Sequence, residues 1–224
     1  MNTNSTALLQ LMRLSSPSLP VGTYSYSQGL EYACNVGWVK DEKTASNWVK
    51  GVLHHGIESL DVPIIREIFH ALTVGDQKQA VWWSSYLLAS RESYELRLQD
   101  KQQGLALIKL LNDIKILDAG EFPEDEMSYA LIFVTASIKW EISLEECVHG
   151  YIWSWLENQV TSAMKLLPLG QTSGQRMLSE LISEIPEAIS CGLSIPNDKI
   201  CSTCYGYGIA SALHETQYTR LFRS

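Results

Sequence analysis

The chain has 224 residues, 46% of them hydrophobic, and a formal net charge of −8. No linker rich in Pro, Gly or Ser divides it, so we expect one domain over residues 1–224, with a core large enough to be stable without disulfides. An acidic chain lacks the basic surface that neutralises phosphates, which argues against nucleic acid and anionic membranes as partners.

Helical periodicity recurs along most of the chain, whereas strand alternation is absent, which predicts an all-α, single-domain multi-helix bundle. The clearest buried stripe consists of Ala45, Trp48, Val49, Val52, Leu53, Gly56, Ile57 and Leu60. The expected helices cover approximately residues 6–14, 26–36, 45–60, 62–73, 77–112, 127–140, 143–167, 172–190 and 205–218.

Capping residues and charges refine these helices. Asp41 is expected to cap the 45–60 helix, and Ser143 with Glu146 forms a capping-box pattern before the 143–167 helix. Asp61, two residues before Pro63, is a further N-cap candidate. The charged run from Arg91 to Arg97, which includes Glu95, is typical of a solvated helix face.

The start of the chain has no basic residue before Leu8 and Leu9, and no apolar stretch reaches the length of about 20 residues that spans a bilayer. Its five cysteines are mostly isolated, as in reduced proteins. We therefore expect a cytoplasmic protein.

The segment from Ser25 to Gly29 weakly resembles the nucleophile elbow of a serine hydrolase, with Ser27 as nucleophile. An elbow needs a preceding strand, but prolines and Gly22 precede this segment. A loop that leads into a helix is the better interpretation, and a hydrolase that uses Ser27 is the less favoured alternative.

The segment from Pro168 to Gln175 is rich in small residues and precedes a predicted helix, so its main-chain amides are able to bind an anion. It lacks the Gly-Lys-Ser/Thr ending of a phosphate-binding loop, which argues against nucleotide hydrolysis. Lys165 lies just before this segment. A lysine at this place either interacts favourably with the dipole at the C-terminus of the preceding helix or contacts a partner protein.

Cys201 and Cys204 form one CxxC pair, with Cys191, His214, His54 and His55 elsewhere in the sequence. One such pair supplies only two ligands of a tetrahedral site. A metal-binding module built on Cys201 and Cys204 is therefore kept as a weak alternative.

The last residues, 214–224, place Leu221 and Phe222 between Arg220 and Arg223. Burial of each apolar side chain would be worth about 1.5–3 kcal/mol. The segment is predicted either to dock on a partner protein or to fold back on its own core with the arginines reaching to solvent.

Three of these segments together resemble the UreF family of urease accessory proteins: residues 16–31, the Pro168–Gln171 segment with Gln175, and residues 214–224. The run from Arg91 to Arg97 with Gly104, and the Asp61–Pro63 step, are similar to the same family. Thr23 departs from it, since a small residue is more frequent there, and so does the Cys201–Cys204 segment.

The resemblance implies a homodimeric, non-enzymatic chaperone without a cofactor of its own. Its implied partners are the accessory protein UreD (also called UreH), the GTPase UreG and apo-urease, into which nickel is inserted. In this picture the tail at 214–224 orders on the UreD-like protein. The surface around Lys165, Gly170, Gln171 and Gln175 faces the GTPase, with Glu31 and Tyr26 on the opposite rim.

The resemblance predicts no catalytic residues and a set of partner-binding residues drawn from the three segments. These are Tyr24, Tyr26, Ser27, Gly29, Glu31, Lys165, Pro168, Gly170, Gln171, Gln175, His214, Glu215, Tyr218, Arg220, Leu221, Phe222 and Arg223.

Overall fold

The computed structural model describes residues 5–224 except 119, 121 and 203, so Thr203 of the CxxC pair and residues 1–4 lie outside it. The described residues form helices and connecting turns and contain no strand, which confirms the all-α prediction. The α-helices are α1 (Ser5–Leu14), α2 (Leu30–Asn35), α3 (Glu42–Val52), α4 (Val62–Thr73), α5 (Gln77–Ala89), α6 (Tyr94–Asp113), α7 (Tyr129–Lys139), α8 (Leu144–Leu166), α9 (Gln171–Ile182), α10 (Ile185–Ser194) and α11 (Tyr205–His214).

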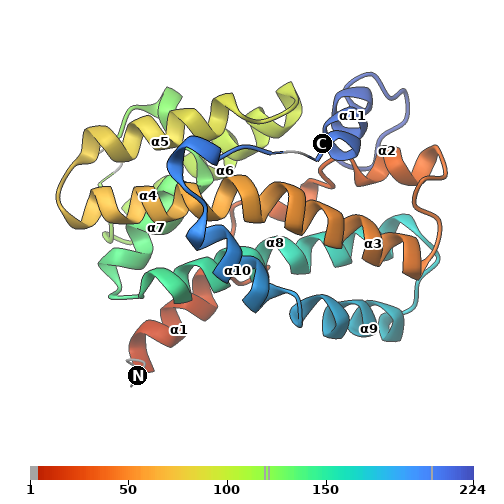
Figure 1. Ribbon diagram of the computed structural model, residues 1–224, viewed down its shortest axis with the longest axis horizontal. Helices are drawn as coiled ribbons and strands as arrows, with labels where there is room; N and C mark the ends of the chain where they lie inside the picture. The colour runs from red at the N-terminus through yellow and green to blue at the C-terminus, as the bar shows by residue number, and fades with distance from the viewer. Residues whose placement is uncertain (1–4, 119, 121, 203) are drawn as a thin grey trace.

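Helix α4 crosses the middle of the bundle and packs against α5, α7, α8 and α10 (Figure 1). Residues 129–137 of α7 are all buried, as expected of a helix that is apolar on every side. Helix α11 packs beside α2, so the C-terminal end of the chain lies next to residues near the start (Figure 1). None of the described helices has the length and apolar character needed to cross a membrane.

The predicted stripe of the 45–60 helix is confirmed by burial: all its members are buried except Trp48, which is half-buried. The helix type changes, however, because α3 ends at Val52 and a nine-residue π-helix, Leu53–Asp61, continues directly into α4. The side chain of Asp41 accepts a hydrogen bond from the Thr44 amide, and Ser143 with Glu146 forms the predicted capping box. Both predicted caps are therefore confirmed.

Two predicted helices are each divided in the structure. The 77–112 helix breaks between α5 and α6, where Ser93 caps α6 by accepting a hydrogen bond from the Leu96 amide. The 172–190 helix breaks between α9 and α10, and Pro186 occupies the first turn of α10, where its missing N–H costs no hydrogen bond. Pro186 is a local signal for the second break, which the prediction of one helix over 172–190 overlooked.

Two other predicted helices are shorter than expected. The 26–36 helix begins only at Leu30, after a 3-10 turn at Thr23–Ser25, and the 205–218 helix ends at His214. The residues released from these helices are the ones that meet in the candidate site.

Candidate functional site

The loop that leads from the 3-10 turn to α2 is held against α8 by side chains of that helix. Trp155 Nε1 and Gln159 Nε2 donate to Gln28 Oε1 at 2.8 and 3.1 Å, and Asn158 Nδ2 donates to the Tyr26 carbonyl at 2.9 Å. Gln159 is the polar member of the apolar stripe of α8, which was the one sequence signal for this contact.

The chain approaches closest to α11 at Gly29. A Cβ atom there would lie 2.8 Å from the Ser211 main-chain nitrogen, and the φ angle of +78° is one that side-chain-bearing residues rarely adopt. Gly29 therefore serves the packing of α2 on α11, and it is buried.

The last residues of the chain fold back onto this loop. The main-chain amides of Ser27 and Gln28 donate to the Ser224 main-chain oxygen at 2.6 and 2.9 Å, and the Arg223 amide donates to the Ser25 carbonyl at 2.8 Å. The Ser224 hydroxyl donates to Gln99 Oε1 at 2.8 Å. The tail in this structure thus follows the fold-back alternative.

A cluster of ionisable side chains, here called the tail clasp, consists of three buried residues, Glu31, Glu95 and His214, and the exposed Arg220. His214 is fully buried, with Nδ1 2.7 Å from a Glu95 oxygen and Nε2 3.2 Å from a Glu31 oxygen. Each nitrogen of the His214 ring thus lies within hydrogen-bond distance of one carboxyl oxygen.

The tail clasp also binds the tail directly. Arg220 Nη1 donates to Glu95 at 2.5 Å, and the main-chain amides of Leu221 and Phe222 donate to the two Glu31 oxygens at 2.6 and 2.8 Å. Charge-assisted hydrogen bonds of this kind are stronger than neutral ones. They fix the tail at the point where Phe222 enters the bundle.

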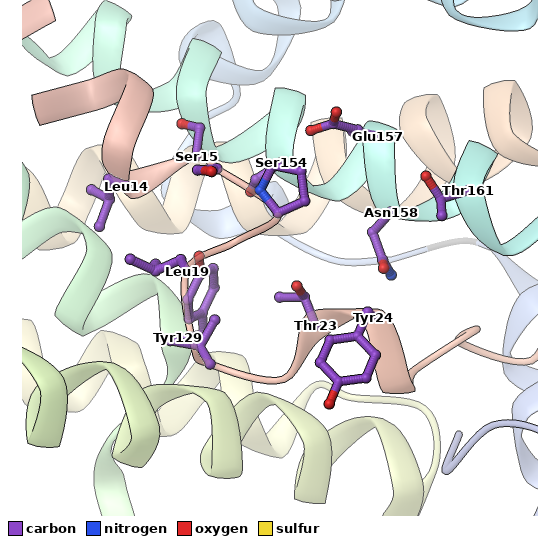
Figure 2. A pocket seen from close by; sticks show the side chains of 13 residues that line it. Leu14, Ser15, Leu19, Thr23, Tyr24, Tyr129, Ser154, Glu157, Asn158 and Thr161 are labelled. Atoms are coloured by element: carbon purple, nitrogen blue, oxygen red, sulfur yellow. The ribbon is translucent and has the colours of Figure 1, made fainter. Parts of the chain in front are cut away.

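Lys165, at the end of α8, joins the loop and the tail at the surface. Its ammonium lies 6.0 Å from the centre of the Tyr24 ring and 5.7 Å from the centre of the Phe222 ring, within cation–π range. Tyr24, Lys165 and Phe222 define what we call the loop–tail surface. A small cavity of about 50 Å³ lies between this loop and α8, where Thr23 and Tyr24 face Asn158 and Thr161 (Figure 2).

The predicted partner-binding residues divide into two groups by exposure. The exposed ones are Tyr24, Lys165, Pro168, Gly170, Gln171, Gln175, Tyr218, Arg220, Leu221 and Arg223. The buried ones are Tyr26, Ser27, Gly29, Glu31, His214 and Phe222, while Glu215 is half-buried. The buried group supports the loop and tail from beneath and does not itself offer exposed surface.

The tail therefore differs from a free docking segment with two apolar anchors. Phe222 is only 6% exposed and is already packed within its own chain, whereas Leu221 is 68% exposed. The burial of Phe222 is not available to a partner while the tail keeps this conformation.

The second predicted segment lies apart from the loop–tail surface in its contacts. Gly170 precedes the first residue of α9, Gln171, and has an extended backbone. In the part of the chain that the structure describes, no hydrogen bond or ion pair connects Gln171 or Gln175 to Tyr24, Lys165 or Phe222.

Ser27 does not have the environment of a nucleophile. It is fully buried, its hydroxyl donates to the Ser224 main-chain oxygen at 2.7 Å, and it accepts a hydrogen bond from the Glu31 amide at 3.2 Å. A nucleophile must be reached by its substrate. The hydrolase alternative is corrected to a structural role in which Ser27 fixes the tail.

The cysteine pair shows no further ligands among the described residues. Cys201 is exposed, while Cys204 is half-buried and its pKa is raised, mainly by burial. Among the described residues, no group of three or more His, Cys, Asp or Glu side chains is arranged to hold a metal ion.

The charged run at 91–97 is only partly the solvated helix face that was predicted: Glu92 and Arg97 are exposed, whereas Glu95 is buried and Arg91 is half-buried. Arg91 donates through Nη1 and Nη2 to Asp61 at 3.0 and 2.7 Å and through Nε to Asp100 at 2.7 Å. Burial lowers the pKa of Arg91, but the charges of Asp61 and Asp100 outweigh it and hold that pKa well above its usual value. Glu95, in the same run, belongs to the tail clasp.

Asp61 likewise makes no side-chain cap, contrary to the sequence prediction. Its carboxylate accepts from Arg91 and from the Tyr151 hydroxyl, at 2.8 Å. Burial, together with the charge of Asp61, raises the pKa of Tyr151 well above its usual value. Arg91, Asp61, Asp100 and Tyr151 form what we call the core charge cluster, which the sequence did not reveal.

Comparison with known proteins covers nearly the whole chain. The family model UreF matches residues 39–182. The urease accessory protein UreF of Alkalilimnicola ehrlichii is 42% identical over 217 residues, covering 96% of this chain and 95% of the relative. Those of Dechloromonas aromatica and Alcanivorax borkumensis are 40% and 39% identical, covering 97% and 99% of this chain and 97% and 100% of the relatives. The chain therefore belongs to the UreF family, whose members are accessory proteins of urease and not enzymes.

Proposed function

We propose that, within urease maturation, this protein binds a UreD/UreH-like accessory protein and recruits a UreG-like GTPase, so that nickel is inserted into apo-urease. In this proposal it regulates the coupling of GTP hydrolysis to nickel transfer without hydrolysing GTP itself. It acts in the cytoplasm, as a homodimer and without a cofactor of its own. Membership of the UreF family supports the role in urease maturation.

The observation that carries the proposal is the meeting of Tyr24, Lys165 and Phe222. They come from three distant parts of the sequence, and each part was predicted to bind a partner. A lysine placed over two aromatic rings, with Leu221 and Tyr218 exposed nearby in the chain, combines the charge and the apolar area found at interface hot spots.

Lys165 and the tail were expected to serve two different partners. Because Lys165 contacts the Phe222 ring, we assign both to one surface, which in this proposal faces the GTPase. The positive charge of Lys165 on an acidic protein suits an acidic patch of that partner. The tail then shapes this surface, and the UreD-like protein binds elsewhere.

Charge reversal tests the assignment. Lys165→Glu should weaken binding of the purified GTPase at least about tenfold, equivalent to about 1.4 kcal/mol, measured by titration calorimetry. Lys139→Glu is the matched control, because Lys139 is also an exposed lysine in the last turn of its helix, α7. Binding of the UreD-like protein should stay unchanged in both variants.

Two results would contradict the proposal. Unchanged affinity of Lys165→Glu for the GTPase would remove Lys165 from the interface. If the variant lost binding of the UreD-like protein but kept binding of the GTPase, the tail and Lys165 would belong to the interface with the UreD-like protein. The sequence analysis predicted that interface for the tail.

A further inference from the structure

Helix α1 is packed on only part of its surface. It buries Ala7 and Leu14 and lies on α8, whereas Leu8, Leu9 and Met12 are exposed. The approach to α8 is close, because a Cβ atom at Gly150 would lie 2.4 Å from Leu11 Cδ1. Helix α1 therefore packs directly on α8 at Gly150, and its exposed leucines and methionine form an apolar face.

Beside this face lies a groove of about 390 Å³ between α1 and α8. Its walls include apolar side chains and four polar ones. We call it the α1–α8 groove and define it by Met12, Ser15, Pro17, His149, Trp153 and Glu157.

Two polar groups of the groove have no partner among the described residues. The Ser15 hydroxyl is buried and makes no hydrogen bond. Glu157 makes no hydrogen bond or ion pair there, and partial burial raises its pKa. Its carboxylate points away from the loop that carries Thr23 and Tyr24 (Figure 2). An uncompensated carboxylate beside apolar side chains is stabilised by an added cation that also donates hydrogen bonds.

We propose that the α1–α8 groove binds a segment of a second accessory protein in which one lysine or arginine is flanked by apolar side chains. The basic side chain pairs with Glu157 and donates to Ser15, and the apolar neighbours cover Leu8, Leu9 and Met12. This inference rests on the proposed function, since it supplies the second binding surface that a bridging protein needs.

The groove lies next to the loop–tail surface along α8, and Glu157 and Tyr24 line one cavity between them. Glu157 precedes Lys165 by about 12 Å along α8, at 1.5 Å per residue. Two partners are thus able to bind side by side along one rigid helix. A second copy of this chain is the alternative occupant that the test below distinguishes.

Two substitutions test the proposal, one for each part of the occupant. Glu157→Lys removes the carboxylate and Met12→Lys interrupts the apolar face. Matched controls are Glu124→Lys, at an exposed glutamate, and Ile182→Lys, at an exposed apolar residue in the last turn of α9. The probes are the purified UreD/UreH-like accessory protein and the UreG-like GTPase of the same organism, and affinities are measured by biolayer interferometry.

We expect Glu157→Lys and Met12→Lys to weaken binding of the accessory protein at least tenfold, with GTPase binding and the control variants unchanged. Exchange of one basic residue of the accessory protein for glutamate should restore binding to Glu157→Lys. Circular dichroism and thermal unfolding establish that each variant is folded.

Wild-type affinity in both folded variants would overturn the inference while leaving the proposed function intact. So would a change from dimer to monomer in Met12→Lys, seen by sedimentation, without loss of the accessory protein, because the occupant would then be a second copy. Failure of the wild-type protein to bind either probe would instead contradict the proposed function itself.

Discussion

The core charge cluster and the tail clasp are two clusters of largely buried ionisable side chains built on one helix, α6, which supplies Asp100 to the first and Glu95 to the second. The two clusters differ in the part of the structure that they stabilise. The side chain of Arg91 is 11% exposed and pairs with Asp61 and Asp100, whereas that of Arg220 is 38% exposed and lies in the tail. The first cluster stabilises the fold, and the second stabilises one conformation of the tail.

The largest effect is expected from Arg91→Met. Removal of the guanidinium leaves Asp61 and Asp100 buried without a cation, which in comparable cases costs about 3–5 kcal/mol. Urea denaturation monitored by circular dichroism measures the free energy of unfolding. A loss below 1 kcal/mol would show that the two carboxylates are not charged in the folded protein, and the contrast between the clusters would disappear.

Glu31→Ala should have a smaller effect on the fold and a specific one on the tail. It removes the acceptor of the Leu221 and Phe222 amides and one partner of His214, at a cost of about 2–3 kcal/mol. Hydrogen exchange should show loss of protection at residues 221–222 while α4 and α7 stay protected. Glu42→Ala, at a glutamate paired with Arg176 on the surface, is the control. Retained protection of the tail amides in Glu31→Ala would contradict the role given to the clasp.

A rise in pH to 11 tests the core charge cluster and not the tail clasp, because only the first contains a tyrosine, Tyr151. The pKa of Tyr151 is raised in the folded protein, so the unfolded chain loses this proton first, and stability falls as pH rises above about 10. At pH 11 this one group removes about 1.4 kcal/mol. Tyr151→Phe should lose less stability between pH 9.5 and 11 in urea titrations. Equal losses in the two proteins would mean that Tyr151 ionises normally in the fold.

The smallest effect reports on the charge of Glu31. The pKa of Cys34 is raised to about 11, mainly by burial and to a smaller extent by the charge of Glu31. Glu31→Gln should therefore lower that pKa and increase the rate of Cys34 alkylation at pH 9.5 by about twofold, followed by mass spectrometry. Cys191 is exposed and provides the reference rate, while buried Cys147 should stay unmodified. An unchanged Cys34 rate would indicate that Glu31 is uncharged within the clasp.

Local sequence patterns account for most of the fold. The stripe at 45–60 and the caps at Asp41 and Ser143 depend on neighbouring residues, and both predictions are confirmed. The break between α5 and α6 could not be predicted in the same way, because the turn there brings Arg91 to carboxylates 30 and 9 residues away in sequence.

The sequence allowed the segments that form the candidate site to be predicted, but not the contacts between their residues. Family resemblance indicated the segments that carry Tyr24, Lys165 and Phe222, yet nothing local places Lys165 between two rings. Glu95 was interpreted as solvated because a charged residue is buried only when the fold supplies partners, here His214 and Arg220.

The π-helix at Leu53–Asp61 bonds each amide one residue further back than an α-helix does, so it accommodates more residues in the same length. Deletion of a single residue there would let the segment become α-helical with little rotation of Asp61 relative to α3, because the wider π-helix absorbs the extra residue locally. A homologue with a one-residue gap at this place is thus expected to keep the pairing of Asp61 with Arg91.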